Sequence, residues 1–164
     1  LNEIVEKLMS LLEPTARHGG VRLINESVEE SLTVEGDAES LEQLMSNLVL
    51  NAIEATLSVK TGSDSQSPSE AEVRLKLFPS GSESVTLEVT DTGPGPESAV
   101  VNKMFEPLVT AKKDGTGLGL FVAREIVQNH HGRLRWERRG QHTCFIVELP
   151  VHQVENARVE ITNC

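Results

Sequence analysis

The chain has 164 residues, 38% of them hydrophobic, and a formal net charge of -10 at pH 7, which suits one compact domain with a single core. The acidic balance excludes a broad positive surface for nucleic acid or anionic lipid, so a phosphate group would be held by local N–H groups, a metal or a few basic side chains. Two cysteines, no apolar run of about 18 residues and no signal-peptide pattern predict a cytoplasmic chain without a disulfide framework, a cysteine zinc site or direct membrane contact.

The N-terminal segment predicts a helix followed by two short strands. Apolar residues at helical spacing indicate a helix over residues 2–17 that ends at Gly19-Gly20. Strands are expected at 21–24 and around Thr33-Val34. Because the chain starts at Leu1, already inside the helical pattern, we expect it to be cut from a larger protein.

A second helix carries the first candidate site residues. Asp37 is typical of an N-cap, and an apolar stripe follows it from 41 to 55. Asn47 and Asn51 are four residues apart, so both lie on the edge of this stripe, where they face a cleft more readily than the core. Amide oxygens there can ligate a hard cation such as Mg²⁺. The alternative is a pair of ordinary surface amides.

A Ser-rich segment at 60–70 predicts a long surface loop. Residues 72–78 and 85–90 then alternate apolar and polar side chains around a turn at 79–84, which predicts a β-hairpin.

The second strand of this hairpin leads into Asp91-Thr92-Gly93-Pro94-Gly95-Pro96. Gly93 and Gly95 let the backbone turn sharply and approach a ligand. A carboxylate at the strand end can accept a hydrogen bond from an exocyclic amine. An ordinary Asp-initiated turn is the alternative.

The next segment combines glycines with lysines. After a short helix at 98–104 comes Lys112-Lys113, in a stretch that suits a flexible lid or a solvated charge run. The glycine-rich run at 115–120 enters a helix at 118–129, closed by Gly132, so its N–H groups could hold phosphates. The run matches neither a Walker A loop nor a Rossmann fingerprint.

The chain ends in a second predicted hairpin, formed by 134–138 and 143–149 around Gly140, and a tail at 151–164. Helices on one face of a mainly antiparallel sheet predict an α+β fold, a two-layer sandwich over residues 1–150.

Four segments together resemble the histidine kinase catalytic domain. They are NLVLNAIEA at 47–55, DTGPGP at 91–96, MFEPLVTAKKDGTGLGL at 104–120 and GQHTCFIVELP at 140–150. In this order they resemble the N, G1, F and G2 boxes of that family, and the resemblance spans roughly residues 1–150. The FEPLVTAKKDGTGLGL version is most similar to the nitrogen-regulation type of sensor kinase.

The resemblance implies a Bergerat ATP-binding sandwich that takes ATP and Mg²⁺. Asn51 would ligate Mg²⁺, and Asn47 would assist at the metal or a phosphate. Asp91 would accept a hydrogen bond from the adenine amino group, while Gly93 and Gly95 would give the base room.

The resemblance also assigns the lid and the phosphate loop. Phe105 would anchor the lid, unless it is a plain core aromatic, and Lys112 would reach the phosphates, which makes Asn47 and Lys112 the candidate catalytic residues. Thr143 would support Asp91 near adenine, unless it is only a strand residue. The phosphate loop would comprise Gly115, Thr116, Gly117, Leu118 and Gly119.

In this family the phosphate acceptor is a histidine on a separate dimeric helical hairpin, and residues 2–17 resemble the link after it. The implied partners are that dimerisation domain and a response regulator receiver domain, with a homodimeric full-length protein. The chain's own histidines lack such a helical context, so we expect no self-phosphorylation on them: His18, His130, His131, His142 and His152.

Three alternatives remain. An ATPase of the gyrase, Hsp90 and mismatch-repair type would need a water-activating carboxylate one turn before Asn51, where this chain has Asn47, and Glu54 lies a turn too late. A protein-serine kinase of the same fold would need a different acceptor. A degenerate interaction module would not bind ATP, which the intact glycine boxes argue against.

Overall fold

A computed structural model describes residues 1–30, 32–60, 71–110, 112 and 115–151. In these residues the elements follow in the order α1 (Asn2–His18), β1 (Arg22–Asn25), α2 (Ala38–Lys60), β2 (Glu72–Pro79), β3 (Ser84–Asp91), α3 (Gly119–Asn129), β4 (Arg133–Arg139) and β5 (His142–Pro150). The expected loop at 60–70, beyond Lys60, and the tail after residue 151 lie outside the described residues. No helix within those residues has the length and apolar character needed to cross a membrane.

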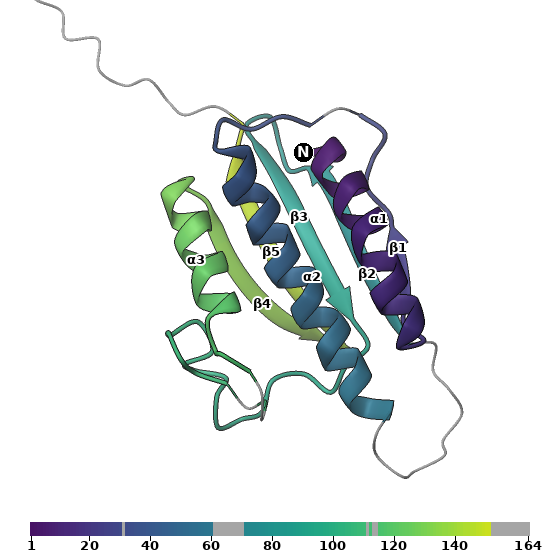
Figure 1. Cartoon of the computed structure of the whole chain (residues 1–164). Helices are drawn as coiled ribbons and strands as arrows, with labels where there is room; N and C mark the ends of the chain where they lie inside the picture. The colour runs from purple at the N-terminus through teal and green to yellow at the C-terminus, as the bar shows by residue number, and fades with distance from the viewer. Residues whose placement is uncertain (31, 61–70, 111, 113–114, 152–164) are drawn as a thin grey trace, which may run out of the picture.

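The strands of the described residues form one five-stranded sheet in the order β1-β2-β3-β5-β4. Only the β1–β2 pair is parallel, and the other pairs are antiparallel. All three helices lie on the same face of the sheet (Figure 1). The predicted α+β two-layer sandwich, with helices on one face of a mostly antiparallel sheet, is therefore confirmed.

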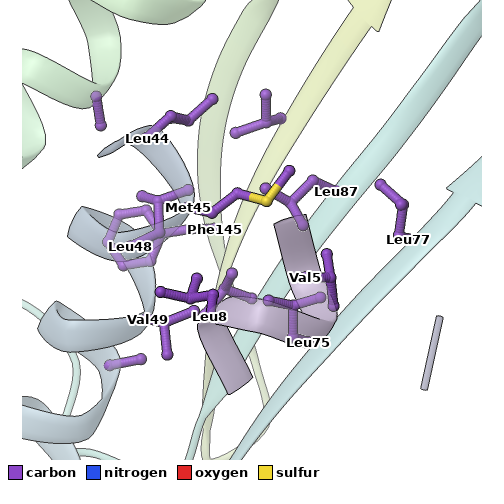
Figure 2. Packing of buried hydrophobic residues seen from close by; sticks show 14 of the residues in the cluster. Val5, Leu8, Leu44, Met45, Leu48, Val49, Leu75, Leu77, Leu87 and Phe145 are labelled. Atoms are coloured by element: carbon purple, nitrogen blue, oxygen red, sulfur yellow. The ribbon is translucent and has the colours of Figure 1, made fainter. Parts of the chain in front are cut away.

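The core lies between this helical layer and the sheet. The α2 stripe buries Leu44, Leu48 and Ala52 completely, and Asn47 and Asn51 are half-buried at its edge, as predicted. Each fully buried leucine stabilises the fold by about 2 kcal/mol. Figure 2 shows side chains of α2 in one cluster with residues of α1, β2, β3 and β5, namely Val5, Leu8, Leu75, Leu77, Leu87 and Phe145.

The opposite face of the sheet is covered by charged side chains instead of helices. Arg139 pairs with Glu88 at 2.8 Å, and Arg74 pairs with Glu72 at 2.6 Å. An antiparallel sheet can leave one face to solvent in this way. The ligand-binding candidates therefore concentrate on the helical side.

Two helix ends follow the predicted chemistry. Gly20 closes α1 with a φ of 69°, and the Val21 N–H group donates to the Ala16 carbonyl at 2.8 Å, which is a Schellman-type end. Asp37 caps α2, because its Oδ2 accepts the Ser40 N–H at 2.8 Å. This hydrogen bond and that of the Ser40 hydroxyl lower the pKa of Asp37.

The end of α3 differs from the prediction. The residue with left-handed backbone is His131, with a φ of 54°, and not Gly132. Gly132 is needed for another reason, since a Cβ there would lie 2.5 Å from the Glu148 carbonyl oxygen. His130 at this end is buried, and its Nδ1 lies 2.8 Å from the Ile126 oxygen, so it has a structural role.

Two short predicted elements are wrong. Thr33-Val34 forms no strand, because the loop beside it is tied to the start of α1: the Leu1 N–H donates to the Leu32 oxygen at 2.9 Å, and Leu32 N–H donates to Asn2 Oδ1 at 3.0 Å. Residues 98–104 form successive turns instead of a helix. Most of their backbone bonds span three residues, as from Lys103 N–H to the Val100 oxygen at 2.9 Å.

Candidate functional site

The predicted site residues gather where the segment between β3 and α3 meets α2 and the β4–β5 hairpin. Figure 1 shows this segment below α3, at the same end of the sheet as the C-terminal half of α2. A Cβ on Gly93 would lie 2.9 Å from the Ala55 oxygen, and one on Gly119 would lie 3.9 Å from Asn47 Oδ1. Residues from three of the four family-like boxes thus approach one another around α2.

Asp91, the last residue of β3, is buried with 1% of its surface exposed. Burial raises the pKa of its carboxyl group to about 6 against the lowering effects of the Gly93 N–H, Arg138, the Thr143 hydroxyl and His142. The Gly93 N–H donates to Oδ1 at 2.8 Å. A buried carboxylate that is ionised at neutral pH can accept a hydrogen bond from an amino group of a ligand.

The glycines after Asp91 meet distinct steric demands. At Gly93 any Cβ would lie 2.7 Å from Asp91 Oδ1 and 2.8 Å from the Ala55 carbonyl carbon, so no side chain fits. Gly95 has a φ of 81°, which favours glycine. The backbone at Gly93 therefore passes close to both α2 and Asp91.

Thr143 and Arg138 support the same end of the site. Thr143 is the cross-strand neighbour of Asp91, and its hydroxyl hydrogen bond is one of the contacts that lower the pKa of Asp91. Arg138 Nη1 donates to Thr143 Oγ1 at 2.6 Å and to the Gly93 oxygen at 2.8 Å. The role of Arg138 was missed from the sequence, although the alternation with Leu134 and Trp136 could have placed it on the helical side of β4.

Asn51, one turn before Ala55 on α2, meets Lys112. Lys112 Nζ donates to Asn51 Oδ1 at 2.9 Å and to Glu54 Oε2 at 2.6 Å. The two charged side chains are about half-exposed, so the ion pair itself adds little stability, about 0 to 1 kcal/mol. Glu54 thus shares the Lys112 ammonium with Asn51, and that Glu54 lies too late on α2 to activate water stays a prediction. The sequence neighbour Lys113 lies outside the described residues.

These contacts test whether the residues suit a magnesium ion. The Asn51 amide oxygen already faces a cation, the Lys112 ammonium, and the Glu54 carboxylate lies at the same ammonium. Amide and carboxylate oxygens are hard donors of the kind that Mg²⁺ takes alongside waters and phosphate oxygens. The donor set therefore fits Mg²⁺.

The glycine-rich run leads into α3. Gly117 has a φ of 67°, and its carbonyl accepts the Leu108 N–H at 3.0 Å, while a Cβ there would lie 2.6 Å from the Leu108 carbonyl carbon. Gly115 is crowded too, with a Cβ position 2.5 Å from Thr110 Oγ1. This packing fixes the approach to the helix, and Thr116 and Leu118 are exposed along it.

α3 begins at Gly119, and among the described residues no side chain caps its first N–H groups. Uncapped N–H groups and the positive end of the helix dipole suit an anion such as phosphate. Phe105, at the start of the predicted lid, is half-buried and packs against the core, so it ties this segment to the sandwich.

Comparison with known proteins identifies the family. Residues 36–153 match the family model described as histidine kinase-, DNA gyrase B-, and HSP90-like ATPase. The C4-dicarboxylate transport sensor protein DctS of Rhodobacter capsulatus is 36% identical over 155 residues, which are 93% of this chain and 22% of that protein. The sensory histidine kinase/phosphatase NtrB of Vibrio alginolyticus is 30% identical over 160 residues, which are 92% of this chain and 43% of that protein. The chain thus spans less than half the length of these relatives.

A solved structure agrees in fold and extent. The catalytic domain of the histidine kinase ThkA superposes with a TM-score of 0.77 at 32% identity, and the match covers 92% of both chains. The chain therefore belongs to the histidine kinase-, DNA gyrase B- and HSP90-like ATPase family, within which it is a sensor histidine kinase catalytic domain.

Proposed function

We propose that this domain binds ATP with Mg²⁺ and directs the γ-phosphoryl group to a histidine on a separate dimerisation domain. The observation that carries the proposal is that the site has two ends of different chemistry. A buried carboxylate, Asp91, lies at the end of β3, and a cation-facing amide, Asn51, lies on α2. One turn before it on α2, Asn47 Oδ1 lies 3.9 Å from the Cβ position of Gly119, at the uncapped start of α3. These ends suit a nucleobase and a metal-bound polyphosphate.

At the base end, Asp91 would accept a hydrogen bond from the adenine amino group. Gly93 and Gly95 would leave room for the base, and Thr143 would hold the carboxylate through its hydroxyl. The burial of Asp91 and the close approach of Gly93 to α2 support these roles.

At the phosphate end, Asn51 would ligate Mg²⁺ and Asn47 would assist it or a phosphate oxygen. When bound, the metal would supply positive charge that offsets the charge of the phosphates. Lys112 would move from Asn51 and Glu54 to a phosphate oxygen. The run from Gly115 to Gly119 would offer N–H groups to the phosphates, and Phe105 would anchor this lid.

Phosphoryl transfer needs alignment and charge stabilisation more than covalent help, which suits a site of amides, one lysine and N–H donors. Hydrolysis should be slow, because position 47 carries an amide and cannot activate water as a carboxylate would. The nearby Glu54 carboxylate is held by Lys112.

The partners follow from the same proposal. The phosphorylated histidine would lie on a dimerisation domain of the same protein, and α1 would link that domain to this one. The full-length protein would be a homodimer, either cytoplasmic or anchored in a membrane with this domain in the cytoplasm. A response regulator receiver domain would then take the phosphoryl group. ThkA, in complex with its response regulator protein TrrA, is similar to this chain at 27% identity with a TM-score of 0.73.

The test is a transfer assay in the full-length protein with γ-labelled ATP. We expect an acid-labile, base-stable phosphohistidine, and a transfer rate that falls by at least about 100-fold in Asn51→Ala and Asp91→Ala. Gln43→Ala, an exposed amide on the same helix, is the matched control and should behave as the wild type. Acid-stable phosphoserine, or unlabelled protein with rapid phosphate release, would favour the serine-kinase or ATPase alternatives instead.

A further inference from the structure

Arg138 contacts two segments that lie beside Asp91, the loop at Gly93 and strand β5 at Thr143. On β4, Leu134 and Trp136 face the helical layer and pack against the core. Arg138 is the next residue on that side of β4, and its side chain reaches the residues around Asp91. Its Nη1 donates to the Gly93 oxygen at 2.8 Å and to Thr143 Oγ1 at 2.6 Å, and a Cβ on Gly95 would lie 3.2 Å from the same nitrogen.

This contact fixes the direction of the Thr143 hydroxyl. A guanidinium group has donors only, so the Thr143 oxygen must accept from Arg138. The single hydroxyl proton is then free to point to Asp91, the cross-strand neighbour of Thr143. Arg138 also holds the Gly93 carbonyl, and the N–H of that residue donates to Asp91 at 2.8 Å. Arg138 thus holds two residues that favour the ionised carboxylate: Gly93, whose N–H donates to Asp91, and Thr143.

The protonation state of a carboxyl group decides which base it can recognise. An ionised carboxylate only accepts hydrogen bonds and matches the 6-amino group of adenine, whereas a protonated carboxyl can donate to the 6-oxo group of guanine. We propose that Arg138, acting through Thr143 and Gly93, is a positioning residue that keeps Asp91 an acceptor and so makes the site select adenine over guanine. This inference rests on the proposed function, in which Asp91 meets the base.

The charged groups that act on Asp91 come from the β4–β5 hairpin. Arg138 lies at the end of β4 and His142 at the start of β5, and both favour the ionised carboxyl group. The near part of α2 is the Ala55 backbone, which adds no charge. Burial opposes ionisation and raises the pKa of Asp91 to about 6, so loss of the Arg138 charge should matter near neutral pH.

The test compares ATP·Mg²⁺ and GTP·Mg²⁺ binding by calorimetry between about pH 5.5 and 8.5 in Arg138→Gln and Thr143→Val. We expect the preference for ATP over GTP at pH 7 to fall by about tenfold or more in each variant. The pH below which ATP binding is lost should rise by about one unit in Arg138→Gln. The double variant should show less than the sum of the two single effects, because the Arg138–Thr143 hydrogen bond is common to both.

Three variants serve as controls. Arg135→Gln removes a charge of the same sign on the same strand, where Arg135 pairs with Glu137 at 3.0 Å, and should leave both readouts unchanged. Arg138→Lys keeps the charge and should restore most of the wild-type pH profile. Because His142 also favours the ionised form of Asp91, His142→Asn reports any share of the profile that comes from that side chain.

The outcomes separate this inference from the proposed function. A folded Arg138→Gln protein with the wild-type pH profile and nucleotide preference overturns the inference, as do additive effects of Arg138→Gln and Thr143→Val. Should Arg138→Gln fail to fold, Thr143→Val decides by the same criteria. Wild-type protein without ATP binding, or full binding by Asp91→Ala, overturns the proposed function and the inference together. If Asp91→Ala loses ATP binding but Arg138→Gln changes neither the nucleotide preference nor the pH profile, the inference alone is overturned.

Discussion

At the scale of single residues, the ionisation of Asp91 couples the site to pH and to stability. Its pKa is raised by burial from 3.8 to about 6, so the folded state binds its proton more tightly than the unfolded state. The stabilising contribution is therefore fully present below about pH 4 and is lost as the pH rises through about 6. At neutral pH the folded protein bears the cost of an ionised buried carboxylate.

Replacing Asp91 by Asn should accordingly stabilise the nucleotide-free protein at neutral pH. We expect an increase of about 2 kcal/mol in the free energy of unfolding near pH 7.5 and little change near pH 4, together with loss of ATP binding. Denaturant unfolding of both proteins at the two pH values measures this difference. A stability difference that does not vary with pH would contradict the assigned pKa shift.

Gly93 gives a second residue-scale prediction. In Gly93→Ala the new Cβ would lie 2.7 Å from Asp91 Oδ1 and 2.8 Å from the Ala55 backbone, so the loop must move. We expect a loss of about 1 to 3 kcal/mol in stability and a clear loss of ATP affinity. Gly81→Ala is the control, because Gly81 has a positive φ of 79° but open space around its Cβ position. Equal ATP affinity in the two variants would argue against the close approach at Gly93.

At the scale of elements, the segment at Leu108 and the run into α3 are joined by close contact between Leu108 and Gly117. Gly117→Ala combines an unfavourable φ of 67° with a Cβ position 2.6 Å from the Leu108 carbonyl carbon. We expect ATP affinity to fall by about tenfold or more, because the N–H groups that would meet the phosphates are displaced. Adenosine, which lacks phosphates, should bind as in the wild type, and calorimetry with both ligands separates these effects. Gly140→Ala, with open space at a φ of 61°, controls for backbone strain, and weakened adenosine binding in Gly117→Ala would refute the assignment.

At the scale of the whole molecule, periodicity in the sequence predicted the long elements well. The 3.6-residue pattern of α2 and the two-residue pattern of β2 and β3 each give the element one strongly apolar side. That side packs against the common core in all three elements. The strand predicted at Thr33-Val34 was wrong because two residues with β propensity do not determine which strand they would pair with. Hydrogen bonds to α1 hold this loop instead.

The missed site features depend on contacts between distant parts of the chain. Arg138 reads in the sequence as one arginine in a basic stretch, and only the fold brings it to the Gly93 carbonyl, 45 residues away. Glu54 was set aside because it lies beyond Asn51 on the helix, yet Lys112, far along the chain, joins the two side chains. Such pairings follow from the fold and leave no local pattern.

The most direct test of the central claim is a calorimetric titration of the wild-type chain with ATP, with and without Mg²⁺, beside Asp91→Ala and Asn51→Ala. We expect micromolar to millimolar binding that Asp91→Ala abolishes and that Asn51→Ala weakens only when Mg²⁺ is present. A folded wild-type chain that binds no ATP, or that binds ATP equally well without Asp91, would contradict that claim.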